Sequence, residues 1–117
     1  MTRELCERTK VFALRIIRLS SALPRRREAT MMARQVLRAG TSVGSHCREA
    51  YRSRSNAELI SKLETALQEL DETSYWLELI SESKLMASQR LEPLLQEADE
   101  LIRILVASVK TIKAKTP

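Results

Sequence analysis

The sequence predicts an all-α protein, an antiparallel four-helix bundle with up-down-up-down topology. Helix-forming residues dominate the 117-residue chain, and two Gly and three Pro are too few for the many tight turns of a β protein. Apolar residues recur at three- and four-residue steps through four long segments. Because the connections between these segments are short, we expect one domain over residues 1–117 in which neighbouring helices pack antiparallel.

The first helix is predicted over residues 3–22. Its apolar face consists of Leu5, Thr9, Phe12, Ile16, Leu19 and Leu23. Pro24 follows directly, and the residue before a proline is biased away from helical geometry. The helix is therefore expected to end close to Leu23.

The second helix is predicted over residues 28–53. Its apolar stripe consists of Met32, Val36, Ala39, Val43, Cys47 and Ala50. The stripe continues across Gly40 and Gly44, although each glycine costs about 1 kcal/mol relative to alanine inside a helix. This cost indicates a close helix crossing or a local kink between the two glycines.

The third and fourth helices are predicted over residues 55–81 and 91–113. Ser55 and Glu58 have the spacing of a capping box at the start of the third helix, and Pro93 suits the first turn of the fourth. The apolar face of the third helix is formed by Leu59, Leu63, Ala66, Leu67, Leu70, Ser74 and Leu77. That of the fourth is formed by Leu94, Ala98, Leu101, Leu105, Val109 and Ile112.

Charge divides the chain into two halves of opposite sign. Residues 1–54 contain 13 Lys and Arg against four Asp and Glu, a formal charge of +9. Residues 55–117 contain seven basic and 11 acidic residues, a formal charge of −4. The basic half suggests a polyanionic partner, and the acidic half suggests complementary contacts within the bundle or between copies. The alternative is that these charges only solvate helix surfaces.

The arginines of the second helix form a stripe opposite its apolar face. At 100° per residue, Arg34, Arg38, Arg48 and Arg52 share this side over roughly 27 Å. The candidate nucleic-acid-binding residues are Arg25, Arg26, Arg27, Arg34, Arg38, Arg48 and Arg52. Tyr51 is assigned to the core side, so we expect no base-stacking platform. RNA or DNA would then be held by its phosphates, with weak sequence preference and steep salt dependence.

The end of the third helix is apolar on nearly all sides. A helix in a monomeric bundle needs one apolar stripe, and the surplus suggests a neighbouring subunit or another helix of the same chain. The candidate residues of an oligomer interface are Tyr75, Trp76, Leu79, Ile80 and His46.

Catalytic, metal and membrane functions are not supported by the sequence. Cys6 and Cys47 lack a CxxC spacing, and His46 and Cys47 are consecutive helix residues that point about 100° apart. No P-loop, GxGxxG or GxSxG motif is present, so we expect no enzyme, cofactor or metal. The charged N-terminus and the lack of a long apolar run predict a soluble, cytoplasmic protein with reduced cysteines.

Several segments resemble a bacterial four-helix-bundle family. They are Leu37–Gly44, Arg48–Ala50, Ala57–Leu63 and Glu69–Ile80. The family includes proteins encoded by intervening sequences in large-subunit ribosomal RNA genes and the accessory variability determinant of diversity-generating retroelements. The resemblance implies a ring-shaped homopentamer and, for the retroelement branch, binding to a reverse transcriptase and its template RNA or DNA. His46 and Cys47 stand where one common version of the motif has Asn and Ile or Val, which leaves the branch open.

Three hypotheses remain at this stage. The first is a nucleic-acid-associated oligomer, with the role of an accessory subunit of a reverse transcriptase as its most specific form. The second is a scaffold whose basic face binds an acidic protein. The third is a small enzyme with an unrecognised site between subunits, which a deep pocket with shifted titratable groups would support.

Overall fold

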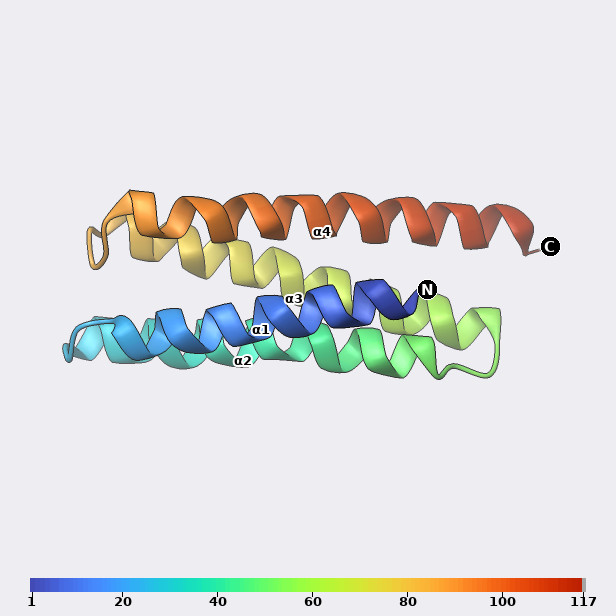
Figure 1. Cartoon of the computed structure of the whole chain (residues 1–117), viewed down its shortest axis with the longest axis horizontal. Helices are drawn as coiled ribbons and strands as arrows, with labels where there is room; N and C mark the ends of the chain where they lie inside the picture. Colours follow the sequence, from blue (N-terminus) through green and yellow to red (C-terminus); the bar gives the residue numbers. More distant parts are fainter. Residues whose placement is uncertain (117) are drawn as a thin grey trace.

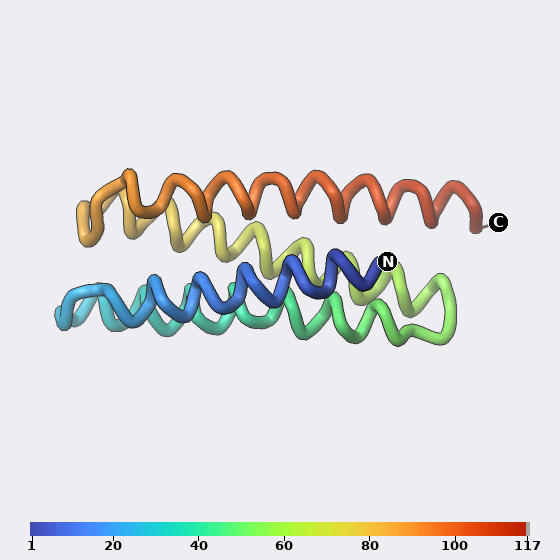
Figure 2. The backbone as a smooth tube through the Cα atoms, in the orientation of Figure 1, coloured from blue at the N-terminus to red at the C-terminus, as the bar shows by residue number. Residues whose placement is uncertain are grey.

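The computed structural model describes residues 1–116, which form four helices and no strand. The helices are α1 (Arg3–Ala22), α2 (Arg27–Tyr51), α3 (Asn56–Glu82) and α4 (Ser88–Lys115). The predicted all-α class is confirmed, and the layout is that of a four-helix bundle (Figure 1). The chain reverses direction at each connection and forms a rod of 50 × 20 × 19 Å (Figures 1 and 2).

Side-chain caps begin two of the helices. The Thr2 hydroxyl accepts a hydrogen bond from the Leu5 amide at 3.2 Å at the start of α1. The Ser55 hydroxyl accepts one from the Glu58 amide at 3.1 Å at the start of α3. The Glu58 carboxylate accepts a bond from the Arg54 amide at 3.4 Å, one residue earlier than in a standard capping box. Local hydrogen bonds therefore define where α1 and α3 begin.

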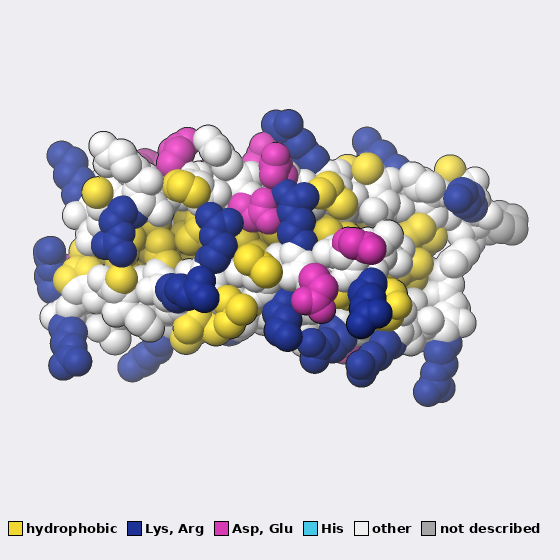
Figure 3. Space-filling model, viewed as in Figure 1, with side chains coloured by type: hydrophobic (Ala, Val, Ile, Leu, Met, Phe, Trp, Pro, Cys, Tyr) yellow, Lys and Arg dark blue, Asp and Glu magenta, His cyan; other side chains and the backbone are white. Residues whose placement is uncertain are grey.

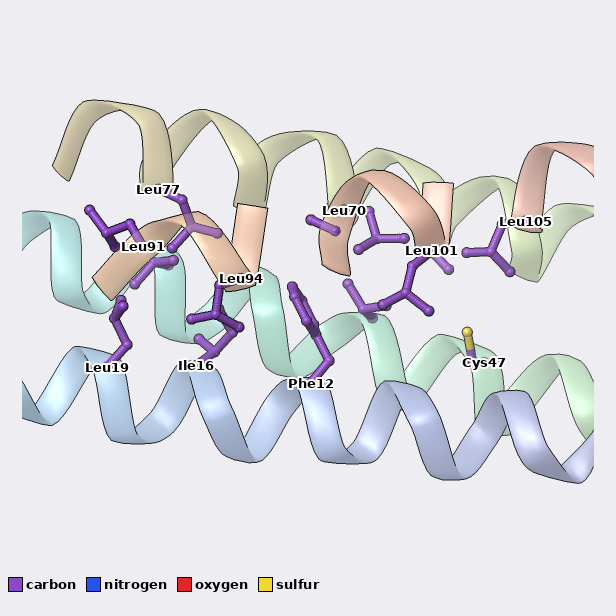
Figure 4. Packing of buried hydrophobic residues seen from close by; sticks show 14 of the residues in the cluster. Phe12, Ile16, Leu19, Cys47, Leu70, Leu77, Leu91, Leu94, Leu101 and Leu105 are labelled. Atoms are coloured by element: carbon purple, nitrogen blue, oxygen red, sulfur yellow. The ribbon is translucent and has the colours of Figure 1, made fainter. Parts of the chain in front are cut away.

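The apolar faces of all four helices meet along the axis of the rod. Figure 4 shows side chains from α1, α3 and α4 pointing into this shared interior, with Cys47 of α2 among them. Phe12, Ile16, Leu70 and Leu101 are completely buried. Thr9 and Thr73 are the buried polar residues among those described, and each hydroxyl donates to a carbonyl of the preceding turn. The core thus leaves no buried side-chain polar atom unpaired within residues 1–116.

Helices α1 and α2 cross closely at the two glycines. A Cβ atom added at Gly40 would lie 2.8 Å from two side-chain carbons of Ile16. One added at Gly44 would lie 3.4 Å from the Thr9 carbonyl oxygen. α2 continues through both positions without interruption, so the glycines serve the close crossing.

An ion-pair cluster joins α1 to α4. Arg8 donates to Glu97 through Nε at 2.8 Å and through Nη2 at 2.7 Å, and Nη2 also reaches Glu100 at 2.6 Å. These hydrogen bonds hold the pKa of Glu97 below its usual range. The cluster links the first and last helices of the chain.

Helix α4 begins earlier than predicted. It starts at Ser88, so Pro93 is its sixth residue and lies beyond the first turn. A proline at this position removes one backbone hydrogen bond, to the carbonyl of Gln89. Both Pro93 and Gln89 are exposed, so water can bind the freed carbonyl and the helix continues.

Candidate nucleic-acid interface

The seven arginines singled out by the sequence are all exposed. Arg27 is the first residue of α2 and Arg52 caps its C-terminal end. Arg25 and Arg26 lie in the connection that precedes α2. Apart from Arg38, these arginines form no ion pair within residues 1–116. Their charge is therefore available to an external anion.

Arg38 differs from the other arginines because it is paired within the chain. Its Nη1 donates to Glu69 of α3 at 3.3 Å, and its Nη2 donates to Glu72 of α3 and to Gln35. Arg38 thus ties α2 to α3, and two carboxylates already offset its charge. A helical wheel of α2 alone cannot reveal this, because the partners belong to another helix.

Two shallow depressions follow the outer groove between α1 and α2. Arg25 and Arg34 line the one near the first connection, together with Leu37. Lys10 and Arg48 line the other, beside Gly44. We call the surface defined by Lys10, Arg25, Arg34 and Arg48 the basic groove. Lys10 is not among the residues predicted from the sequence. The available signal was its position on the side of α1 that faces α2.

The basic groove has the length needed to follow a nucleic-acid backbone. Arg34 and Arg48 are separated by 14 positions of one helix, or about 21 Å at 1.5 Å per residue. At about 3.4 Å per phosphate along one strand, this distance spans about six phosphates. Figure 3 shows Lys and Arg side chains along the length of the molecule, with hydrophobic side chains exposed between them.

Exposed apolar residues accompany the cations on α1 and α2. Val11, Leu14 and Ile17 of α1 and Met31 and Leu37 of α2 are all partly open to solvent. An apolar contact surface is therefore present beside the basic groove.

Tyr51 is the main correction to the sequence analysis. It was assigned to the core side of α2, but its side chain is 50% exposed. Cys6 near the start of α1 contacts Cys47, with its Sγ donating to the Cys47 carbonyl oxygen at 3.6 Å. Tyr51 lies one turn beyond Cys47 on the side of α2 that faces α1, and it lies past the residue at which α1 begins, so α1 does not cover it.

The predicted oligomer-interface residues have different environments. Tyr75 is 54% exposed, whereas Ile80 is completely buried in the core of its own chain. The inclusion of Ile80 in an external surface is therefore wrong. Trp76 is half-buried, donates from Nε1 to Glu72 at 3.1 Å and packs edge-to-face against Tyr75 at 5.4 Å.

His46 is half-buried on α2 and takes part in a polar chain between helices. Its Nδ1 lies 2.9 Å from Glu49, and Glu49 accepts a hydrogen bond from Lys62 of α3 at 3.1 Å. The bond from Lys62, and then that with His46, lowers the pKa of Glu49. The His46 ring therefore interacts with groups of its own chain on the side of α2 near α3, and it is not paired with a cysteine thiol.

The cysteines are not arranged for chemistry. Burial raises the pKa of the Cys47 thiol to about 11, so this group stays protonated at neutral pH. Within residues 1–116, no three His, Cys, Asp or Glu side chains are grouped to bind a metal ion. None of the described helices combines the length and the apolar character that a membrane crossing requires.

Comparison with known proteins identifies the family of this helical protein. Residues 2–107 match the family of 23S rRNA-intervening sequence proteins. A crystal structure of a protein of unknown function from Bacteroides thetaiotaomicron, assigned to the S23 ribosomal protein family, aligns with a TM-score of 0.85 and 34% identity. The alignment covers 91% of this chain and 98% of that one. No curated protein matches significantly. The chain belongs to the 23S rRNA-intervening sequence protein family.

Proposed function

We propose that this protein is a non-enzymatic nucleic-acid-binding protein that holds the phosphates of RNA or DNA in the basic groove. The observation that carries the proposal is the lack of internal partners for Lys10, Arg25, Arg34 and Arg48 within residues 1–116. Arg8 and Arg38 show that nearby carboxylates do pair with arginine where the bundle needs it. The groove cations stay exposed and unpaired, which suits an external polyanion.

Backbone binding of this kind has a defined physical signature. Each phosphate that a cation neutralises releases condensed counterions, so the affinity falls steeply as salt is added. Phosphate contacts carry no base information, so the protein should have little sequence preference in this groove. Four groove cations predict a loss of about 100-fold in affinity between 50 and 200 mM salt.

We further propose that several copies assemble into a ring-shaped homo-oligomer, with five as the number implied by the family resemblance. Tyr75 and Leu79 support this proposal because they leave an apolar, partly exposed surface on α3. Copies in one ring would combine several weak phosphate contacts into tighter binding. Native mass spectrometry measures the number directly, and a monomer would exclude the ring.

A narrower proposal is an accessory role beside a reverse transcriptase, in which the protein holds the template RNA or DNA. Its support is the resemblance to the accessory variability determinant of diversity-generating retroelements. A reverse-transcriptase gene with template and variable repeats beside the gene for this chain would support the role. A gene located within a ribosomal RNA gene would instead support the intervening-sequence branch.

Charge reversal tests the nucleic-acid proposal. The variant carries Arg25→Glu, Arg34→Glu and Arg48→Glu, all in the basic groove, and leaves Arg38 intact because a carboxylate there would face Glu69 and Glu72. We expect its affinity for a 20-nucleotide RNA to fall by about 100-fold at 50 mM salt, measured by fluorescence anisotropy.

The matched control changes the same number of charges on the opposite half. Arg90→Glu, Lys110→Glu and Lys115→Glu alter exposed α4 cations that form no ion pair within residues 1–116, and we expect the affinity to change by less than about threefold. Equal losses in both variants would mean that only net charge matters, which contradicts a defined groove. Saturable binding to an acidic protein, without RNA or DNA binding, would favour the scaffold hypothesis instead.

A further inference from the structure

We propose that Tyr51 is a stacking platform for an unpaired base, so that the protein prefers single-stranded RNA or DNA over duplex. This inference rests on the proposed function and adds a class of ligand to it. An exposed aromatic ring beside arginines is the arrangement with which proteins hold single strands, because every base has a face that can stack.

The ring of Tyr51 lies at the arginine-rich end of α2. Arg48 precedes it by three positions and therefore lies on a neighbouring part of the helix surface. Arg52 follows it directly, and the Arg52 amide donates back to the carbonyl oxygens of Arg48 and Glu49 at 3.2 Å. The helix thus ends at the ring, with one arginine in the turn before it and one directly after it in the chain.

A second observation gathers positive charges at this end. Burial raises the pKa of the Cys6 thiol; the nearby charges of Arg48, the N-terminal amine and Arg52 oppose that shift, and the carboxylate of Glu7 adds to it. Since Cys6 contacts the carbonyl of Cys47, one turn before Tyr51, the N-terminal amine of the chain adds a positive charge near this end of α2.

Three acidic residues lie near this end: Glu7 of α1 is exposed, whereas Glu49 and Glu58 are engaged by other groups of the chain. Glu49 and Glu58 share a depression with Arg52, Arg54 and Lys62. Glu49 accepts hydrogen bonds from Lys62 at 3.1 Å and pairs with His46 at 2.9 Å, while Glu58 accepts from the Arg54 amide at 3.4 Å. The Arg52 and Arg54 guanidinium groups form no ion pair within residues 1–116, so they can bind phosphates on either side of a stacked base.

Tyr75 provides an internal comparison. It is exposed to nearly the same extent as Tyr51, at 54% against 50%. Its helical neighbours, however, are Asp71, Glu72 and Glu78. Glu72 pairs with Arg38, whereas Asp71 and Glu78 form no ion pair within residues 1–116 and would repel a phosphate backbone. Exposure alone would make the two rings equivalent, and the surrounding charge selects Tyr51.

The test combines protein variants with matched probes in fluorescence anisotropy at 50 mM salt. The probes are a 12-nucleotide oligothymidine, the same backbone with abasic sites, and a duplex of equal length. We expect the native protein to bind oligothymidine about tenfold more tightly than the abasic probe, because only the first offers a base to stack. Tyr51→Leu should lose this tenfold advantage and bind the abasic probe and the duplex as the native protein does.

Two control variants separate stacking from other effects. Tyr51→Phe keeps an aromatic ring and should retain native binding, and Tyr75→Leu removes an equally exposed ring and should also retain it. If Tyr51→Leu does not fold, the comparison of the two single-stranded probes on the native protein still decides the question.

The possible outcomes distinguish this inference from the proposed function. Equal binding of oligothymidine and the abasic probe by the native protein would overturn the stacking role and leave backbone binding intact. An equal loss on all three probes in Tyr51→Leu would also overturn it, because the loss would then be structural or electrostatic. No binding of any probe by the native protein would overturn the proposed function itself.

Discussion

The two halves of this bundle treat their charges differently. On α3 and α4, three of the basic residues pair with acids, through Lys62–Glu49, Lys113–Glu64 and Arg103–Asp99. On α1 and α2, Arg8 and Arg38 are the arginines that find partners within residues 1–116, and in both cases the acids belong to the other half. The acidic half therefore offsets only a small part of the basic half, and the remaining cations stay on its outer face.

Net charge alone therefore does not locate a binding surface on this protein. Four carboxylates of α3 and α4 reach across to the arginines of α1 and α2, namely Glu69, Glu72, Glu97 and Glu100. The arginines that they contact stabilise the bundle. Those beyond their reach define the face that is open to a partner.

The close crossing in the basic half gives the largest expected effect on stability. Both glycines of the chain lie on α2, and a Cβ at Gly40 would overlap the buried side chain of Ile16. We expect Gly40→Ala to lower the free energy of unfolding by about 1–2 kcal/mol, since overpacking outweighs the gain in helix propensity. Chemical denaturation followed by circular dichroism measures this change.

Gly44→Ala is the matched control for that crossing. Its Cβ would make an ordinary contact, at 3.4 Å from the Thr9 carbonyl oxygen. The better helix propensity of alanine should then leave the protein as stable as before, or up to about 1 kcal/mol more stable. If Gly40→Ala were as stable as Gly44→Ala, the crossing would be looser than described.

The ion-pair cluster between the halves gives a smaller effect. Arg8→Met removes the two hydrogen bonds to Glu97 but keeps much of the side-chain volume. We expect the free energy of unfolding to fall by about 1 kcal/mol, because Arg8 is partly exposed and solvent screens the pair.

The same cluster predicts a pH dependence. The pKa of Glu97 is lowered in the folded protein, so its contribution to stability is present above the ordinary carboxyl pKa of about 4.3. The contribution is lost as the pH falls through the lowered pKa, when the carboxylate is protonated. Denaturation at several pH values between 3 and 7 gives the free energy of unfolding at each pH. As the pH is lowered, this free energy should fall more steeply for the native protein than for Arg8→Met. Parallel curves would exclude a role for the Arg8–Glu97 pair.

Local patterns predict most of the fold but only part of the candidate site. The periods of three and four residues place α1 and most of α2 and α3 because burial follows helix geometry. Arg38 and Tyr51 could not be placed in this way. The environment of Arg38 depends on the acids of α3, and that of Tyr51 depends on where α1 begins. Both are properties of how the helices align, and the pattern within one helix does not contain them.

Ile80 and Pro93 show the same limit at the other end of the bundle. The sequence shows that Ile80 belongs to an apolar turn of α3. The packed structure adds that its side chain is buried in the core of the same chain. Pro93 favours a first-turn position, yet α4 extends back to Ser88 because the proline lies on an exposed side of the helix. In each case tertiary context decided between two local interpretations.

Hydroxyl-radical footprinting of the native protein with and without RNA locates the nucleic-acid-binding face, because exposed reporter side chains lie on both halves of the bundle. We expect RNA to protect Ile17 and Leu37 beside the basic groove and to leave Tyr75 of α3 as reactive as before. Protection of Tyr75 without protection of Ile17 and Leu37, or no protection at any of the three, would contradict the assignment of nucleic-acid binding to the α1–α2 face.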